Sequence, residues 1–106
     1  MVARGEIWLA TLDPTVGSEI QKTRPVLVVS PDDMNDHLRT VIIVPLTSGS
    51  QPAYFRVETQ FADKKGLMLL DQVRAIDKRR LKKHLGVVEP STLETTLALL
   101  REVFAP

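Results

Sequence analysis

The sequence predicts a mainly β fold with some α structure (α+β): a small, strongly curved antiparallel barrel with a C-terminal helix. The chain has 106 residues, the usual size of one domain, and we expect residues 1–106 to form a single domain. Several short β-rich runs are separated by prolines, glycines and polar stretches. The last part of the chain instead repeats leucine at helical spacing, and short strands followed by one helix favour a curled sheet with a helix packed on it.

The first half of the chain contains three predicted strands, at residues 6–12, 24–30 and 40–46. The first alternates weakly and follows a glycine, whereas the other two are continuous apolar runs typical of buried strands. Residues 13–23 are predicted to be a long loop, because Asp13-Pro14 and Gly17 interrupt them. The polar stretch 31–39 predicts a turn or a single helical turn.

The second half begins with a predicted loop and continues with shorter strands. We expect strands at residues 54–58, 66–76 and 85–89, the second of them broken near Asp71-Gln72 into one or two strands. A helical turn is expected at residues 77–83, with Asp77 as its cap.

The C-terminal segment STLETTLALLREVF predicts an amphipathic helix. Ser91 and Glu94 fit an S-x-x-E capping box at its start. Apolar residues recur at steps of four, three and four, which predicts one buried stripe made of Leu93, Leu97, Leu100 and Phe104.

Composition excludes several classes of protein. Apolar residues make up 43% and charged residues 25%, which is typical of a globular chain. No cysteine is present, so disulfides, thiol nucleophiles and cysteine-bound zinc are excluded. Two histidines, His37 and His84, are too few for a histidine-rich metal site, and both are expected at the surface; we expect no metal and no cofactor. No apolar leader or membrane-length run occurs, which favours a cytoplasmic protein with no membrane partner.

Positive charge is concentrated in residues 74–84, RAIDKRRLKKH. This segment holds six of the fourteen Lys and Arg residues and only one acid, Asp77. Such a patch can attract a polyanion or an acidic peptide, and a solvated surface turn is the equal alternative.

Polar side chains flank the ends of the predicted strands. Arg24 begins the second strand, Thr47 and Ser48 follow the third, and Asp71 and Gln72 interrupt a later one. If these ends converge, a guanidinium and a hydroxyl would suit a phosphodiester. Each also has a structural interpretation: a salt bridge for Arg24, and turn hydrogen bonds for Thr47 and Ser48. Asp71 lies in an apolar run and needs a partner, for which Arg24 or Arg74 is expected.

The motifs GEIWLATLDPTVGSE, TRPVLVVSP, VPLTS and LLDQVRAIDKRRL, in this order, resemble the MazF/PemK (Kid) toxins of type II toxin–antitoxin systems. The resemblance runs from Gly5 to the C-terminal helix. It implies an SH3-like β-barrel that forms a homodimer. It also implies a sequence-specific, metal-independent endoribonuclease that cuts single-stranded RNA, chiefly messenger RNA, and an antitoxin whose acidic C-terminal segment blocks the RNA groove.

The resemblance is closer to the MazF branch, whose key pair is the arginine of the R-P motif and the threonine that ends the third strand. It therefore implies Arg24 and Thr47 as catalytic residues. The PemK/Kid branch has a histidine and an arginine where this chain has Ser18 and Leu69. Glu19, Asp71 and a water molecule remain alternatives for the general base. The loop over residues 48–53 is expected to shape the groove, and the expected substrate-binding residues are Ser18, Glu19, Gln21, Ser48, Asp71, Gln72 and Arg74.

Two other functions remain open. CcdB-like toxins share this barrel and poison DNA gyrase, but they rely on an aromatic-glycine-isoleucine ending, and this chain ends REVFAP. A barrel that binds nucleic acid without cutting it is the second alternative. An RNA cleavage assay distinguishes both from a ribonuclease.

Overall fold

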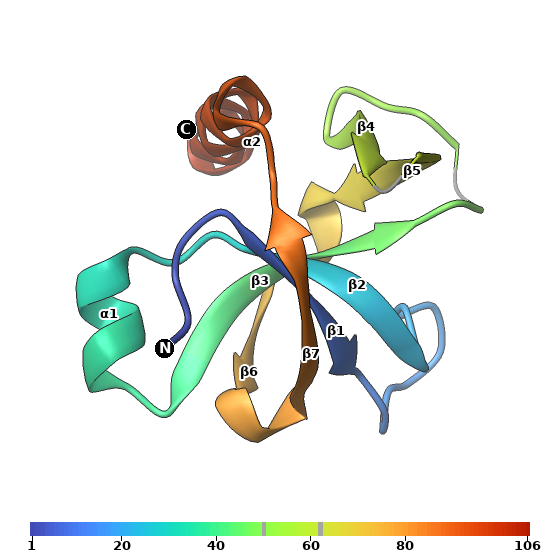
Figure 1. Ribbon diagram of the computed structural model, residues 1–106. Coiled ribbons are helices and arrows are strands. Elements are labelled where there is room, and N and C mark those ends of the chain that lie inside the picture. The colour runs from blue at the N-terminus through green and yellow to red at the C-terminus, as the bar shows by residue number, and fades with distance from the viewer. Residues whose placement is uncertain (50, 62) are drawn as a thin grey trace.

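The computed structural model of the chain is one curled antiparallel sheet with a helix packed on it (Figure 1). The structure describes residues 1–49, 51–61 and 63–106. The strands are β1 (Glu6–Thr11), β2 (Thr23–Val28), β3 (Thr40–Thr47), β4 (Arg56–Phe61), β5 (Lys64–Leu69), β6 (Arg74–Asp77) and β7 (Leu81–Val87). They pair in the order β4-β5-β3-β2-β1-β7, and β6 pairs with β3. The predicted mainly β fold with a C-terminal helix is confirmed.

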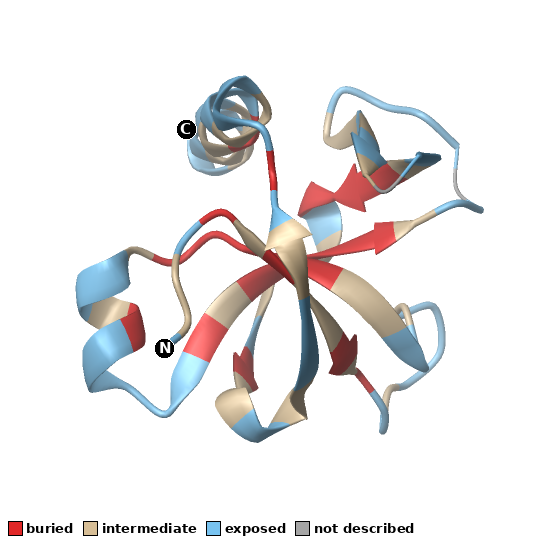
Figure 2. Cartoon of the chain, in the orientation of Figure 1, coloured by how far each residue is buried: buried red, intermediate tan, exposed pale blue. Residues whose placement is uncertain are grey.

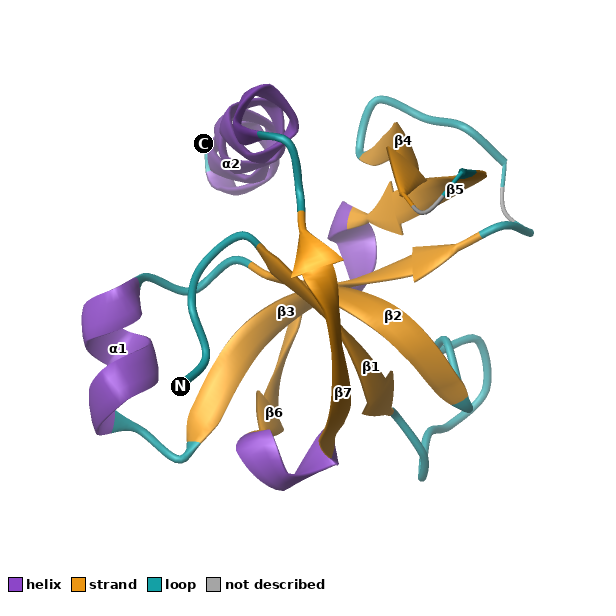
Figure 3. Ribbon diagram, in the orientation of Figure 1, coloured by secondary structure: helices purple, strands orange, loops and turns teal. Residues whose placement is uncertain are grey.

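Helical segments connect or follow the strands (Figure 3). They are α1 (Asp32–His37), the 3₁₀ helices η1 (Leu70–Gln72) and η2 (Lys78–Arg80), and α2 (Pro90–Phe104). The expected break at Asp71-Gln72 is η1, and it separates β5 from β6 as predicted. None of the described helices is long and apolar enough to cross a membrane.

The central strands are buried on both faces, as their continuous apolar runs predict (Figure 2). Along β2, Leu27 belongs to one apolar cluster, whereas Val26 and Val28 belong to another on the opposite face. Leucines of α2 pack against the Leu27 cluster. The curled sheet therefore has two cores that share the same strands.

The start of α2 differs from the prediction. The helix begins at Pro90, and Glu89 precedes it with no side-chain hydrogen bond, so the capping box at Ser91 and Glu94 was wrong. Proline suits the first helical position because it has no N–H to leave unpaired. Leu93, Leu97 and Leu100 pack on the core as predicted, but Phe104 is 71% exposed. Phe104 is the last residue of the helix and lines only a surface groove, so the buried stripe ends at Leu100.

The predicted strand bounds differ from the observed ones, most of all at the last strand. The strand expected at 54–58 is β4, which begins at Arg56, and the strand expected at 85–89 begins earlier, at Leu81. The helical turn expected at 77–83 is the shorter η2, and Asp77 caps it by accepting a hydrogen bond from the backbone N–H of Arg79 at 2.8 Å. Because η2 ends at Arg80, the chain is free to pair with β1 from Leu81 onward.

Strand β3 pairs with β2 over part of its length, and the end of this pairing creates the hollow described below. On one edge β3 pairs with β2 as far as Val26 and Pro45. On its other edge it pairs first with β6 and then with β5, with Thr47 opposite Leu67. Gly66 precedes Leu67 in β5 and lies close to the end of β3: a Cβ there would be 3.1 Å from the Thr47 carbonyl oxygen. The two strands β2 and β3 therefore separate just after Pro45.

Candidate functional site

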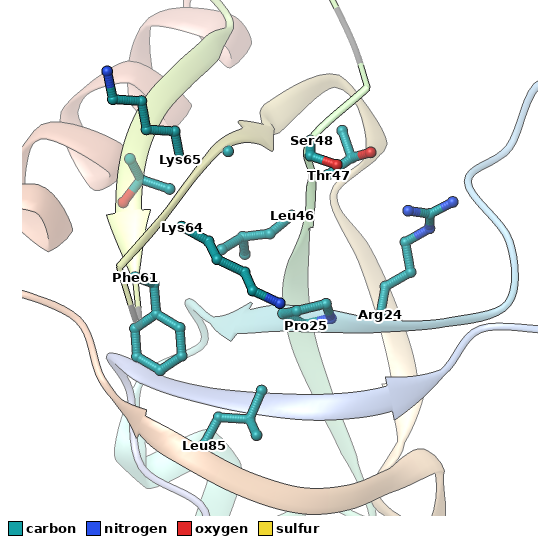
Figure 4. A pocket seen from close by; sticks show the side chains of 11 residues that line it. Arg24, Pro25, Leu46, Thr47, Ser48, Phe61, Lys64, Lys65 and Leu85 are labelled. Carbon is teal, nitrogen blue, oxygen red and sulfur yellow. The ribbon is translucent and has the colours of Figure 1, made fainter.

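The separation of β2 from β3 leaves a hollow of about 440 Å³, which we call the Arg24 hollow (Figure 4). Its residues come from β2, β3, β4, β5 and β7 and from the residue after β3. They are Arg24, Pro25, Leu46, Thr47, Ser48, Thr59, Phe61, Lys64, Lys65, Gly66 and Leu85. The structure thus brings together three residues that the sequence analysis singled out: Arg24, Thr47 and Ser48.

Arg24 and Thr47 lie on the same side of this hollow (Figure 4). The β2–β3 register pairs Val26 with Pro45, so two further steps along each strand lead to Arg24 and Thr47. The Nε of Arg24 donates to the carbonyl oxygen of Gln21 at 3.0 Å, which fixes the root of the guanidinium. The hydroxyl oxygen of Thr47 accepts from the backbone N–H of Gly49 at 3.3 Å, which leaves its own O–H available as a donor.

Two lysines of β5 also line the Arg24 hollow, and the sequence analysis missed them. Figure 4 shows the Lys64 amine pointing into the hollow near Pro25, whereas the Lys65 amine points away. In the sequence they belong to a polar stretch that resembles any exposed turn. The pairing of β5 with β3, with Leu67 opposite Thr47, brings the strand that carries them to the hollow.

The opposite wall of the hollow is apolar. Phe61 and Leu85 form it in Figure 4, and both are half-buried. The hollow therefore joins donors and positive charge on one side to an aromatic wall on the other. A nucleotide with an unstacked base suits such a hollow: its charged phosphate matches the donors and positive charge, and its flat base matches the aromatic wall.

A second hollow of about 560 Å³, the Asp71 hollow, gathers most of the other expected binding residues. It is lined by Ser18, Glu19, Ile20, Arg56, Asp71, Gln72, Val73 and Arg74. They come from the loop after β1, from β4, and from the stretch that runs from η1 into β6. Gln21 lines neither hollow, although its carbonyl oxygen holds Arg24.

The partner of Asp71 is Arg56, so the expected pairing with Arg24 or Arg74 was wrong. Nε and Nη2 of Arg56 donate to the two carboxylate oxygens at 3.2 and 3.0 Å. The side-chain hydrogen bond to Asp71 raises the pKa of the Arg56 guanidinium. Asp71 lies in η1 and is exposed, because the apolar run ends at Leu70. Arg74 instead donates to the carbonyl oxygen of Leu12 at 3.5 Å.

The loop between β1 and β2 connects the two hollows. The side-chain oxygen of Gln72 accepts from the backbone N–H of Ile20 at 2.6 Å. A carboxylate oxygen of Glu19 accepts from the backbone N–H of Val16, also at 2.6 Å. Gln21 follows Ile20 in the loop, and its carbonyl oxygen accepts the hydrogen bond from Nε of Arg24. The loop that borders the Asp71 hollow therefore also positions the guanidinium in the Arg24 hollow. Within the loop expected at 48–53, residue 50 lies outside the described residues.

Cations of the basic segment 74–84 mainly hold the fold together. Lys78 donates to the Asn35 carbonyl oxygen, and Arg80 donates to the carbonyl oxygens of Thr11 and Asp13. Arg79 pairs with Asp77, and this hydrogen bond lowers the pKa of the Asp77 carboxyl group. Arg74 is the member of the segment that lines one of the two hollows.

The histidines lie apart from both hollows. His37 is exposed, as expected, and its Nδ1 lies 2.6 Å from the Asp33 carbonyl oxygen. His84 is also exposed; it lies 3.2 Å from a carboxylate oxygen of Glu6 and packs edge-on against Trp8. Across residues 1–49, 51–61 and 63–106, no group of three or more His, Asp or Glu side chains could hold a metal ion.

Comparison with known proteins shows related sequences along nearly the whole chain. The sequence model of the family described as PemK-like, MazF-like toxin of type II toxin–antitoxin system matches residues 3–104. The Endoribonuclease PemK of Escherichia coli is 41% identical over 106 residues, covering 94% of this chain and 80% of that protein. The Endoribonuclease MazF of Staphylococcus epidermidis is 35% identical over 99 residues, covering 88% and 82% respectively. Relatives from both branches match well, so the closer resemblance to the MazF branch stays a prediction.

Solved structures share the fold. MazF (Form-I) from Deinococcus radiodurans superposes with a TM-score of 0.86 at 25% identity, covering 96% of this chain and 94% of that one. A MazE-MazF crystal structure (Form-III) from the same organism gives a TM-score of 0.75 at 25% identity, with 96% and 94% coverage. The chain therefore belongs to the family of PemK-like, MazF-like toxins of type II toxin–antitoxin systems.

Proposed function

We propose that this chain is the toxin of a type II toxin–antitoxin system and acts as a sequence-specific, metal-independent endoribonuclease on single-stranded RNA in the cytoplasm. Its relatives in Escherichia coli and Staphylococcus epidermidis are named endoribonucleases. The observation that carries the proposal is the convergence of Arg24, Thr47 and Lys64 in one hollow beside an aromatic wall. Cleavage of messenger RNA would stop translation and growth.

The Arg24 hollow suits the scissile phosphodiester. Arg24 keeps Nη1 and Nη2 for phosphate oxygens, because its Nε is held by Gln21. Thr47 donates its hydroxyl hydrogen to a non-bridging oxygen. These donors are fixed before substrate arrives and therefore stabilise charge that develops in the transition state without having to reorganise.

The substrate supplies the nucleophile. The ribose 2′-oxygen loses its proton and attacks the adjacent phosphorus, which forms a pentacovalent phosphorane. Arg24 and Thr47 stabilise its extra negative charge. The bond from phosphorus to the 5′-oxygen then breaks, and the leaving oxygen takes up a proton. The products are a 2′,3′-cyclic phosphate and a 5′-hydroxyl end.

Of the three alternatives for the general base, the geometry favours a water molecule. Glu19 and Asp71 both line the Asp71 hollow and not the Arg24 hollow. Asp71 is also engaged on both oxygens by Arg56. We therefore assign these carboxylates to recognition of the RNA, where they accept hydrogen bonds from unstacked bases.

The proposed assembly is a homodimer controlled by an antitoxin. The family is defined as one half of toxin–antitoxin systems, and a MazE-MazF complex shares this fold. An acidic C-terminal antitoxin segment would be attracted to the cations of the Arg24 hollow and would occupy the place of RNA.

The first experiment measures cleavage of a long single-stranded RNA by the purified protein in EDTA, with analysis of the new ends. Arg24→Ala is compared with Arg39→Ala, which removes an exposed arginine that lines neither hollow. We expect cuts at a short motif with 5′-hydroxyl ends. The rate should fall by at least about 10²–10³-fold in Arg24→Ala and stay near wild type in the control.

Two outcomes contradict the proposal. Wild-type cleavage by a folded Arg24→Ala protein removes Arg24 from the reaction. A wild-type protein that is folded and cuts none of several RNAs is not a ribonuclease, and a gyrase supercoiling assay then tests the CcdB-like alternative.

A further inference from the structure

We propose that Arg56 is a specificity-determining residue, which positions Asp71 so that its carboxylate selects an RNA base carrying an exocyclic amino group. The inference rests on the proposed ribonuclease function and assigns a role to a residue that sequence analysis did not single out. It begins with the two hydrogen bonds between Arg56 and Asp71 at 3.2 and 3.0 Å.

The pair joins β4 to η1. Arg56 stands opposite Leu69, the last residue of β5, and Asp71 follows two residues later, inside η1. A long arginine side chain can span this distance. Its guanidinium carbon also lies 5.9 Å from the centre of the Phe55 ring, which supports it from one side.

The backbones that carry the pair are tied together. The backbone N–H of Leu70 donates to the Phe55 carbonyl oxygen at 3.0 Å, which joins the residues just before Asp71 and Arg56. The N–H of Val73 closes η1 by donating to the Leu70 carbonyl oxygen at 3.3 Å. Asp71 is therefore held through its carboxylate and through the backbone hydrogen bonds of Leu70 and Val73 on either side of it.

The Asp71 carboxylate lines the Asp71 hollow and still has acceptor capacity. A carboxylate offers about four lone-pair sites, and Arg56 occupies one on each oxygen. The side chains of Arg56 and Asp71 are 25% and 33% exposed, so a ligand can reach them. Gln72, beside Asp71, accepts from Ile20 through its oxygen, which leaves its amide N–H groups as donors.

This arrangement fits particular bases. Adenine, cytosine and guanine each present an amino group that can donate to Asp71, beside acceptors that Gln72 or Nη1 of Arg56 can reach. Uracil lacks the amino group: its N3–H is the single donor on its pairing edge and lies between two carbonyl oxygens, which would face the carboxylate unfavourably. We therefore expect one position of the cleavage motif to reject uracil.

The alternative is that Arg56 and Asp71 form a purely structural ion pair. Exposed ion pairs of this kind contribute little to stability, which gives that alternative little weight. The chain contains a second pair of the same type, Arg79 with Asp77, at 3.0 Å and outside both hollows. Its Nε and Nη2 also donate to the two carboxylate oxygens. Arg79→Gln is therefore a matched control for Arg56→Gln.

The test sequences the cut sites that each protein makes in a random-sequence single-stranded RNA library. Defined oligonucleotides with and without uracil at the selected position then give kcat and KM, and a copy with a 2′-O-methyl group at the scissile nucleotide gives binding alone. Thermal unfolding confirms that each variant is folded.

We expect wild type to reject uracil at one position and Arg56→Gln to lose about tenfold of that discrimination, mainly through KM. Arg56→Lys, which keeps the charge without the two-pronged geometry, should restore part of it. Asp71→Asn should lose the discrimination as well. Arg79→Gln should keep the cleavage motif, with any loss of binding uniform across sequences.

The two proposals fail in different ways. If wild type cuts RNA and folded Arg56→Gln keeps the same motif and the same uracil discrimination, the role of Arg56 is overturned and the ribonuclease function stands. The role also fails if Arg79→Gln changes the motif as much as Arg56→Gln does. If wild type cuts no RNA, the proposed function is rejected and the role of Arg56 with it.

Discussion

At the scale of single residues, the proposed site divides its work between groups that bind phosphate and groups that bind bases. Arg24 and Thr47 converge because two strands separate beside them, and Asp71 and Gln72 are presented by one turn of 3₁₀ helix. The loop between β1 and β2 touches both sets through Ile20 and Gln21. A change in this loop should therefore affect the rate and the motif together.

Thr47 provides a direct test of the hydroxyl donor. Thr47→Ala removes the O–H that the hollow presents and should lower the cleavage rate by about 10²–10³-fold. Thr47→Ser keeps the hydroxyl and should retain most of the rate. Single-turnover cleavage of a defined RNA by both variants makes the measurement. Equal loss in the two would mean that the methyl group of Thr47 matters through packing, and that the hydroxyl has no role.

Lys64 should contribute charge to RNA binding. Its amine points into the Arg24 hollow, whereas the amine of its neighbour Lys65 points away (Figure 4). Lys64→Ala should weaken binding of a non-cleavable RNA and reduce the slope of log affinity against log salt by about 0.7, the value for one phosphate contact on a single strand. Lys65→Ala makes the same change in net charge, but its slope should stay closer to the wild-type value than that of Lys64→Ala. Identical slopes for the two variants would show that only overall charge matters.

At the scale of elements, close packing between β5 and β3 fixes the end of the strand that carries Thr47. A Cβ at Gly66 would lie 3.1 Å from the Thr47 carbonyl oxygen, and backbone cannot move aside as a flexible side chain can. Gly66→Ala should therefore lower the free energy of unfolding by about 1–3 kcal/mol and slow cleavage by displacing Thr47. Urea denaturation measures the first effect. Gly49→Ala is the control, because nothing lies within 4 Å of a Cβ there; a loss as large as that of Gly66→Ala would contradict the packing argument.

The elements that sequence predicts well are those whose pattern follows directly from burial. Strands β2 and β3 are apolar on both faces, since each face meets its own core. The beginning of β7 was missed because Lys82, Lys83 and His84 are exposed on an edge strand, and their polarity resembles a loop. Lysine on an edge strand also discourages pairing with another sheet.

The site was predictable only in part, for a related reason. Motifs identify Arg24, Thr47 and Asp71 one by one, because each is a polar residue at the end of an apolar strand. The Arg56–Asp71 pair depends on the register of β4 against β5, which no local pattern of the sequence specifies. Lys64 enters the Arg24 hollow through the pairing of β5 with β3, which is likewise a long-range property.

At the scale of the whole molecule, the two apolar clusters share the strands β1, β2 and β3, so neither can be lost alone. Leu27 belongs to the cluster under α2, and its neighbours Val26 and Val28 belong to the opposite cluster. The single tryptophan, Trp8, packs against the second cluster and therefore reports on it by fluorescence. Far-ultraviolet circular dichroism reports on strands and helix together.

Leu27→Ala should consequently destabilise both clusters at once. Leu27 is fully buried, so the substitution should lower the free energy of unfolding by about 2–5 kcal/mol. Denaturation at one fixed protein concentration should give coincident fluorescence and circular dichroism transitions, both shifted by the same amount. Leu38→Ala, at a side chain that is 46% exposed, should shift neither appreciably. A fluorescence transition that stays in place while circular dichroism shifts would mean that the clusters unfold separately. The hollow between β2 and β3 could then open without loss of the rest of the fold.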